Sequence, residues 1–410
     1  MPVTRPTSAP WGKRSLHSMD KQTQAIHSPW QRKDPFGALA MPLYHQVAYE
    51  FDTAAEMVES FTLRSDRPDY ARIMNPTVTH LERRVQQLTG AADVIAMNSG
   101  MAAISNTLLL LAASGKNIVT SRHLFGNTFS LIAGSLTRFG VRPKLVDLTQ
   151  EDAVRGAVDE ATCCIFVEII TNPQMEIADL RLLSAIAHER GALLVADTTM
   201  IPFTQFSARA LGVDVEVVSS TKYLSGGGTS LGGLIIDYGT HPGWGHRMRA
   251  EMLSNFGATM TPHAAYMQTL GLETLAVRYA RQAQTALELA RRLRDVPGIE
   301  GVCYPGLEDN PYHELCTRQF GPTAGAMLTF MLADEAACFR FIDRLQLIHR
   351  ATNLFDNRTL AIHPASTIFG LFSPKQRRAM DVDDRLIRLS VGLEHPDDLL
   401  QDIRQACAGV

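Results

Sequence analysis

The sequence predicts an α/β protein with a mainly parallel central sheet, followed by a smaller α+β domain. Short apolar strands alternate with helical stretches from residue 91 to residue 236, the order typical of parallel strands joined by crossover helices. Several strands are apolar along their whole length, as strands covered on both faces are. After residue 262 a long amphipathic helix replaces this alternation. We therefore expect an N-terminal arm over residues 1–65, a large domain over 66–262 and a small domain over 263–410.

The composition is that of an ordinary globular protein and argues against several classes of partner. Of the 410 residues, 45% are hydrophobic and 20% charged, and the net charge of -3 provides no basic field for nucleic acid or anionic membrane. Six cysteines without a C-x-x-C pair indicate reduced thiols of a cytoplasmic protein, with neither disulfides nor a metal site. No apolar run approaches the ~20 residues of a membrane span, and the N-terminus lacks the apolar core of a secretory signal.

The N-terminal part predicts two helices after an irregular arm. Five prolines among polar residues over 1–35 indicate a disordered or draped segment. Asp52 or Thr53 then caps a short helix. Pro76 disfavours helix at the residue before it, so Thr77 caps the next helix, whose apolar residues recur at three- and four-residue steps.

The alternating region supplies the predicted large sheet. Its strands are expected at residues 93–97, 117–120, 143–146, 164–168, 192–197, 213–218 and 231–236, with helices at 98–113 and 180–190. In parallel sheets ligands collect outside the carboxyl ends of the strands. Four of these ends carry polar groups: Asn98-Ser99, Glu168, Asp197 and Ser219 to Lys222. We expect these groups to face one crevice.

The predicted small domain begins with a helix over residues 269–295, whose apolar side chains lie on one face and which Pro297-Gly298 ends. Strands at 326–330 and 386–391 and a helix near 335–347 follow. No internal repeat or low-complexity tract interrupts the chain.

Lys222 is the candidate catalytic residue. It follows an apolar strand and precedes three glycines that leave space beside its amine. Most lysines are solvated surface charges, but an amine in this position suits a Schiff base with the aldehyde of pyridoxal phosphate (PLP). The hydroxyls of Ser219 and Thr221 are candidate donors to the phosphate of that cofactor.

Two further requirements of PLP are met in the same region. Backbone N–H groups at a helix N-terminus bind phosphate, and Ser99, Gly100 and Met101 join a strand to a helix. A carboxylate keeps the pyridine nitrogen protonated, and Asp197 ends a buried strand. Each feature alone has an ordinary explanation as a cap or turn. Their combination at strand ends indicates PLP.

Longer motifs support this interpretation. They are YARIMNPTVTHLERR from Tyr70, NSGMAA from Asn98, HLFGNTFSL from His123, FVEIITNPQ from Phe166, VADTT from Val195, SSTKYLSGG from Ser219, GLETLAVR from Gly271, YPGLEDNPYH from Tyr304 and RLSVGLE from Arg388. In these motifs the chain resembles the Cys/Met-metabolism PLP enzymes, which include cystathionine γ-synthase, methionine γ-lyase and the O-acylhomoserine sulfhydrylases. Four segments, IMNPT, LFGNT, EIITNP and GLIIDYG, look most similar to the O-acetylhomoserine sulfhydrylase branch.

The resemblance implies a fold, an assembly and a set of site residues. The fold would be that of aspartate aminotransferase (type I), and the assembly a homotetramer of two tight dimers. The residues implied to bind the cofactor are Tyr70, Arg72, Ser99, Gly100, Met101, Phe125, Asn172, Asp197, Thr199, Ser219, Thr221 and Lys222. Tyr70 and Arg72 would reach the phosphate of a neighbouring subunit. The amino-acid substrate would contact Asn172, Asn353 and Arg388, with Arg388 gripping its carboxylate as a bidentate fork.

The chain departs from the family pattern at four places. Asp197-Thr198-Thr199 stands where the family has D-N-T. Phe125 replaces the usual tyrosine over the PLP ring, and a phenyl ring stacks without a hydroxyl to move protons. Gly227 replaces a histidine after the lysine motif. Asn353-Leu354-Phe355 replaces S-L-G, and the bulk of Phe355 is expected to reshape the substrate pocket.

The resemblance and these residues predict γ-replacement on an O-acylhomoserine-type amino acid. Loss of a Cβ proton would expel the Cγ substituent, and sulfide or a thiol would then add. The alternatives are γ-elimination, on methionine or on an unusual γ-substituted amino acid, and a cofactor-binding homologue without turnover.

Overall fold

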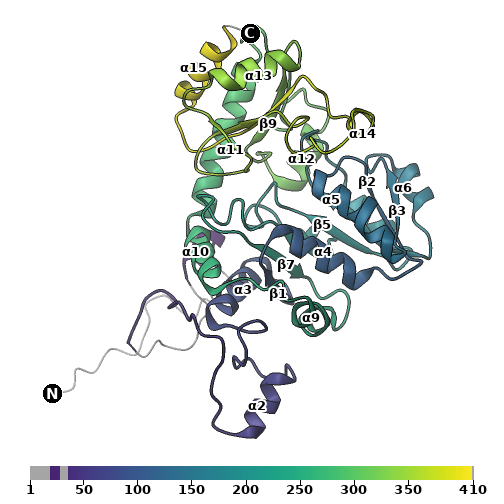
Figure 1. Cartoon of the computed structure of the whole chain (residues 1–410), viewed down its shortest axis with the longest axis vertical. Coiled ribbons are helices and arrows are strands. Elements are labelled where there is room, and N and C mark those ends of the chain that lie inside the picture. The colour runs from purple at the N-terminus through teal and green to yellow at the C-terminus, as the bar shows by residue number, and fades with distance from the viewer. Residues whose placement is uncertain (1–18, 28–35, 409–410) are drawn as a thin grey trace, which may run out of the picture.

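The computed structural model describes residues 19–27 and 36–408. Two sheets organise it, one built from residues 93–237 and the other from residues 300–390. Figure 1 shows the second sheet and its helices above the first, with α11 (Leu275–Leu293) running upward alongside the second sheet. Within the described part of the chain, no helix combines the length and apolar character needed to cross a membrane.

The large sheet has seven strands and is mainly parallel, as the sequence predicts. In spatial order they are β1 (Asp93–Met97), β7 (Gly233–Asp237), β6 (Val215–Val218), β5 (Leu193–Asp197), β4 (Thr162–Glu168), β2 (Asn117–Ser121) and β3 (Arg142–Val146). Only β7 runs against its neighbours, pairing antiparallel with both β1 and β6. The carboxyl ends of the other strands therefore share one edge.

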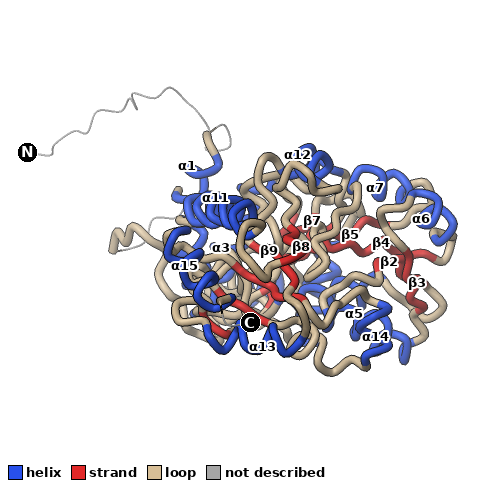
Figure 2. Tube along the Cα trace, turned by 90° about the horizontal axis from the view of Figure 1, so that it is seen from above, coloured by secondary structure: helices blue, strands red, loops and turns tan. Residues whose placement is uncertain are grey.

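Helices cover both faces of this sheet, which explains its near-continuous apolar strands. Figure 2 shows α6 (Glu151–Ala157) and α7 (Leu180–His188) on one side of the strands and α5 (Gly126–Ser130) on the other. α4 (Gly100–Leu111) packs on the same face of the sheet as α5, against β6 and β7. Two separate apolar clusters result, one for each face.

The second sheet is mostly antiparallel, in the spatial order β10 (His349–Arg350), β11 (Leu360–Ile362), β12 (Leu386–Ser390), β9 (Met327–Met331) and β8 (Glu300–Cys303). α11 and α13 (Glu335–Arg344) pack against it, and α15 (Pro396–Cys407) packs against both of these helices. The remaining helices are α1 (Lys21–Ile26), α2 (Ala54–Phe61), α3 (Pro76–Thr89), α8 (Trp244–Arg247), α9 (Ser254–Phe256), α10 (Pro262–Glu273), α12 (His313–Phe320) and α14 (Pro374–Ala379), with shorter 3-10 or π turns at Leu131–Ser135, Leu136–Phe139, Arg209–Leu211 and Met248–Leu253.

The sequence predicts a capping residue for each of the helices α2 and α3, and the structure shows which side chain caps each one. Thr53 caps α2 by accepting the Glu56 N–H (3.2 Å). The prediction that Thr77 caps the next helix is wrong, because Asn75 is the cap and its Oδ1 accepts the Thr77 N–H (2.9 Å). The Thr77 hydroxyl instead donates to the Pro42 carbonyl (2.9 Å).

The irregular arm predicted for residues 1–35 is wrong over Lys21–Ile26, which form the helix α1 against α3 and α10. Asp20 caps α1, and the Lys21 amine donates to the Phe203 carbonyl (3.1 Å). Residues 1–18 and 28–35 lie outside the described part of the chain.

The single helix predicted over residues 269–295 is also wrong. The chain forms α10 and α11 with a break at Thr274, whose N–H bonds to the Gly271 carbonyl. A Cβ on Gly271 would lie 1.9 Å from the Leu224 carbonyl oxygen, so the helix touches the lysine loop there. Arg278 then donates to the carbonyls of Gly271 (2.6 Å) and Tyr223 (2.8 Å). The apolar residues keep a helical spacing through this point, but the contact with the lysine loop interrupts the helix.

Candidate active site

A cavity of about 420 Å³ opens at the carboxyl edge of the large sheet. The structure brings all the predicted site residues except Tyr70 and Arg72 to its wall: Ser99, Gly100, Met101, Phe125, Asn172, Asp197, Thr199, Ser219, Thr221, Lys222, Asn353 and Arg388. The last two come from the C-terminal part of the chain. Both parts of the molecule therefore build the cavity.

Lys222 lies in the loop after β6, and its amine donates to Asn353 Oδ1 (3.0 Å). The pKa of Lys222 is lowered to about 8, mainly by burial and then by the positive charge of Arg388. The negative charge of Asp197 raises this pKa and so partly opposes the shift. An amine with this pKa is neutral in an appreciable fraction of molecules near neutral pH. It is thus prepared to attack a carbonyl carbon, as the sequence motif predicts.

This lowered pKa predicts how the apoprotein captures PLP. The attack requires the neutral amine, so the rate of Schiff-base formation should rise with pH to a midpoint near the Lys222 pKa of about 8. Absorbance after rapid mixing of the full-length apoprotein with PLP measures this rate at each pH. Lys222→Ala is the control that should form no Schiff base at any pH. A midpoint near the usual lysine value, about 10.4, would contradict the structure.

The N-terminus of α4 and the lysine loop meet at one side of the cavity. Ser99 Oγ caps α4 by accepting the Ala102 N–H (3.1 Å), leaving the N–H groups of Gly100 and Met101 without intrahelical acceptors. A Cβ on Gly100 would lie 2.6 Å from that of Ser219, so glycine is required for this approach. The result is a pocket of backbone donors at the positive end of a helix, which suits a phosphate.

The hydroxyl groups around this helix end are held by the backbone. Thr199 Oγ1 accepts the Ser219 N–H (2.8 Å). Thr221 Oγ1 donates to the Gly232 carbonyl (3.1 Å) and accepts the Gly232 N–H (2.9 Å). Ser219 and Thr221 line the cavity, as predicted, and the Thr221 hydroxyl already has two backbone partners.

Two carboxyl groups, the partly buried Asp197 and the buried Glu168, end the adjacent strands β5 and β4. Burial raises the pKa of Asp197, opposed by hydrogen bonds from Thr199 and by the charge of Lys222. Burial and then the Asp197 charge raise the pKa of Glu168 well above its usual range. Within the described residues Asp197 forms no ion pair, so a cationic ring nitrogen beside it would supply the missing charge.

Glu168 lies at the end of its predicted strand, but the sequence pattern predicts no role for it. Its Oε1 accepts the Phe125 N–H (2.7 Å), so this carboxyl group holds the loop that carries the aromatic wall of the cavity. The signal was present in the sequence as a carboxylate ending an apolar strand, but such a residue is also an ordinary turn residue.

Arg388 lies on β12 with its guanidinium fully buried, and this burial lowers the pKa of Arg388 to about 9. It donates to Asn172 Oδ1 (3.2 Å) and to the Asn353 carbonyl (3.3 Å). Its Nε is buried without a hydrogen-bond partner among the described residues. A buried cation with only neutral partners is costly until an anion joins it, which fits a substrate carboxylate.

Tyr70 and Arg72 do not reach the cavity of their own chain. The Arg72 guanidinium bonds to the Ser254 carbonyl and lies over the Tyr70 ring, 5.5 Å from its centroid. The Tyr70 side chain is exposed. Their role at a neighbouring subunit stays a prediction.

Phe355 is fully buried but does not line the cavity, in contrast to the expected reshaping of the pocket. Its ring stacks on Tyr223, with centroids 3.8 Å apart and planes 5° apart. The Phe355 backbone has a φ of 58°, which costs about 1 kcal/mol or more for a residue other than glycine. The stack therefore lies behind the lysine loop and connects it to the Asn353 loop.

Comparison with known proteins identifies the family. The sequence model of the family of Cys/Met metabolism PLP-dependent enzymes matches residues 22–408. The chain belongs to this family. PLP is accordingly its cofactor, and its Asp197 carboxylate and α4 N-terminus have the chemistry that the ring nitrogen and phosphate need.

Relatives of this family member include two kinds of enzyme at similar distance. It is 37% identical to an O-succinylhomoserine sulfhydrylase of Pseudomonas aeruginosa, over 93% of each chain. It is 36% identical to an L-methionine gamma-lyase of Fusobacterium nucleatum, over 93% of this chain and 96% of the other.

The fold is that of solved PLP enzymes. A Campylobacter jejuni chain assigned as an O-acetylhomoserine (thiol)-lyase superposes with a TM-score of 0.91 at 33% identity, covering 95% of this chain and 100% of the other. That structure contains pyridoxyl-lysine monophosphate. The α/β fold of type I PLP enzymes predicted from the sequence is thus confirmed.

Proposed function

We propose that this family member catalyses γ-replacement on an O-acylhomoserine-type amino acid, exchanging the acyloxy group on Cγ for sulfide or a thiol. The observation that carries the proposal is the buried Lys222 amine with a pKa of about 8, in a cavity that also contains the fork of Arg388. The sulfhydrylase relatives support the choice of substrate class.

The chain's own groups divide the work. Bound PLP supplies an electron sink that acidifies the Cα and Cβ protons of an amino acid. Arg388 binds the α-carboxylate and so fixes the orientation of Cα. Lys222, once its amine is free, takes the Cα proton and returns a proton where the leaving group departs. Phe125 offers only an aromatic face without a hydroxyl, so we assign the proton transfers to Lys222.

The second candidate is γ-elimination, which uses the same proton transfers but ends in a 2-oxo acid and ammonia. The identity of 36% to methionine gamma-lyases favours keeping it as an alternative. A homologue that binds the cofactor without turnover is the third candidate, and the presence of Lys222, Asp197 and Arg388 in one cavity argues against it.

Product analysis separates the three candidates. The holoenzyme is incubated with O-acetylhomoserine, O-succinylhomoserine, methionine or cystathionine, each with and without sulfide, and products are identified by mass spectrometry. We expect homocysteine from an O-acylhomoserine only when sulfide is present. A 2-oxo acid and ammonia formed equally without sulfide would establish elimination instead. Bound PLP with no product from any substrate would favour the inactive homologue.

We further propose a homotetramer of two tight dimers, in which Tyr70 and Arg72 of one subunit complete the phosphate site of the next. Their exposed position outside their own cavity supports this arrangement. The cytoplasm is the proposed compartment, since all six cysteines are free thiols.

A further inference from the structure

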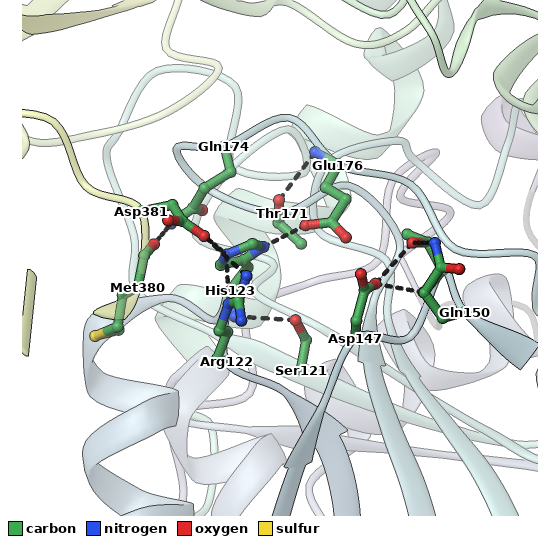
Figure 3. Close-up of polar contacts among 11 residues, drawn as sticks. Ser121, Arg122, His123, Asp147, Gln150, Thr171, Gln174, Glu176, Met380 and Asp381 are labelled. Carbon is green, nitrogen blue, oxygen red and sulfur yellow. Dashed lines mark hydrogen bonds and ion pairs between the residues drawn. The ribbon is translucent and has the colours of Figure 1, made fainter. Parts of the chain in front are cut away.

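A cluster of charged side chains connects the C-terminal part of the chain to the loop after β2, beside the cavity. Figure 3 shows His123 lying between two carboxylates from different parts of the molecule. Its Nδ1 contacts the Glu176 carboxylate, in the loop after β4, and its Nε2 lies 2.7 Å from Asp381 Oδ2. Arg122 also pairs with Asp381 (3.1 Å). None of these four side chains lines the cavity or belongs to the site described above.

Asp381 belongs to the 363–384 segment, which connects β11 to β12 and includes α14. Within this segment Ala365, Phe369, Met380 and Val382 form an apolar cluster of their own. The Gln174 side chain, two residues before Glu176, donates to the Met380 carbonyl (2.6 Å). The segment is thus fastened to the loop after β4 as well as to His123.

The same segment forms one wall of the cavity next to Phe125. A Cβ on Gly126 would lie 2.8 Å from the Ile368 carbonyl oxygen, so the two backbones are in direct contact. Phe129 and Phe372 pack edge to face, with ring centroids 5.9 Å apart. Ile368 and Phe125 both line the cavity. Their relative position therefore depends on how the segment is seated on the loop that begins at His123.

The His123 ring holds both carboxylates only when it carries two protons. A neutral imidazole has one N–H donor and one acceptor nitrogen, so it would present a lone pair to one of the two carboxylates. The imidazolium form donates to both. Protonation of His123 therefore determines whether Asp381 and Glu176 are held together or whether one contact becomes repulsive.

The charges around His123 favour the protonated form. Burial lowers the pKa of His123, but hydrogen bonds and charge from Glu176 and Asp381 outweigh it, so the net shift is upward. Arg122 opposes protonation, with its Nε 3.2 Å from His123 Nε2. Asp147, directly after β3, is a further negative charge that interacts with His123, although its carboxylate bonds to Thr149. Tyr312 is a neutral group near Glu176 and Asp147.

We propose that His123 is a positioning residue for substrate binding: held between Glu176 and Asp381, it seats the 363–384 segment and so sets the distance between the Phe125 and Ile368 walls of the cavity. The contact of this segment with the His123 loop does not depend on the reaction. The identity of the substrate whose binding it affects rests on the proposed function. A group whose folded-state pKa is raised contributes fully below its ordinary pKa, about 6.5 for histidine, and is lost as pH rises through the raised value. The cavity wall should accordingly loosen in alkaline solution.

Hydrogen–deuterium exchange of the holoenzyme tests the seating without any substrate. The variants are His123→Asn and Asp381→Asn, and the matched control is Asp384→Asn, which removes an exposed carboxylate of the same segment that pairs with Arg377 instead. At pH 6.5 we expect peptides from residues 363–384 to exchange about tenfold faster in both test variants, a change equivalent to ~1.4 kcal/mol of opening free energy. Wild type and the control should match.

The pH dependence of substrate binding separates positioning from simple structural support. In wild type and the control, KM for the amino acid should rise as pH increases through the raised pKa of His123, with kcat little changed. In His123→Asn and Asp381→Asn this step should be absent and KM should already be high at low pH.

Unchanged exchange in both test variants would overturn the proposal. It would equally be overturned if exchange increased while KM kept the wild-type pH step, because the cluster would then only support the fold. If no γ-substituted amino acid is turned over, the proposed function fails. The exchange experiment still decides the seating in that case, because it needs no substrate.

Discussion

Replacing Lys222 with alanine is expected to abolish turnover, with a loss of about 10⁴-fold or more. In the proposed mechanism the lysine amine provides both the covalent attachment of PLP and the proton transfers at Cα. Lys222 is the lysine that lines the cavity within the described part of the chain, and burial lowers its pKa to about 8. Single-turnover mass spectrometry with O-acetylhomoserine and sulfide measures the residual rate.

Lys116→Ala is the matched control, since that lysine is exposed and does not line the cavity. It should retain wild-type turnover and the absorbance of the bound Schiff base, which Lys222→Ala should lack. Turnover by Lys222→Ala within tenfold of wild type would remove the basis of the proposed chemistry.

Replacing Arg388 with lysine is expected to lower kcat/KM by about 30- to 150-fold, equivalent to the loss of ~2–3 kcal/mol from hydrogen bonds to a charged group. Lysine keeps the charge but cannot present two parallel N–H donors to a carboxylate. It also cannot keep the bonds to Asn172 and Asn353, which fix the guanidinium plane. Steady-state kinetics over a range of amino-acid concentrations measures the loss.

The carboxamide of the same amino acid makes this experiment specific. Wild type should discriminate strongly against the amide, and Arg388→Lys should discriminate much less, because the lost contact is the one to the carboxylate. Arg385→Lys, at a partly exposed arginine that pairs with Asp383, is the control and should behave as wild type. Equal discrimination in Arg388→Lys and wild type would place the carboxylate elsewhere.

The part of the site that follows from strand ends was predictable. Parallel strands bring their carboxyl ends to one edge, so Ser99, Asp197 and Lys222 were expected together although more than 120 residues separate the first from the last. Arg388 and Asn353 were placed only by resemblance to the family motifs. No periodicity in the sequence connects β12 to the large sheet.

The rest depends on contacts between distant residues. The break at Thr274 arises where Gly271 meets the lysine loop, while the apolar spacing through it stays helical. His123 and Asp381 are 258 residues apart. The Tyr223–Phe355 stack likewise joins two loops, and local sequence propensity predicts the loops but not the contact between them.

The antiparallel strand β7 also constrains the order in which a growing polypeptide acquires its site. At its end β1 carries the Ser99 turn, for which we propose phosphate binding. Among the described strands β1 pairs with β7, which emerges from the ribosome about 140 residues later. Gly233 of β7 lies directly under that turn, where a Cβ would come within 2.1 Å of the Ser99 carbonyl oxygen. A nascent chain that ends before β7 therefore lacks the strand that packs beneath the Ser99 turn, so we expect PLP to bind only after β7 has been synthesised.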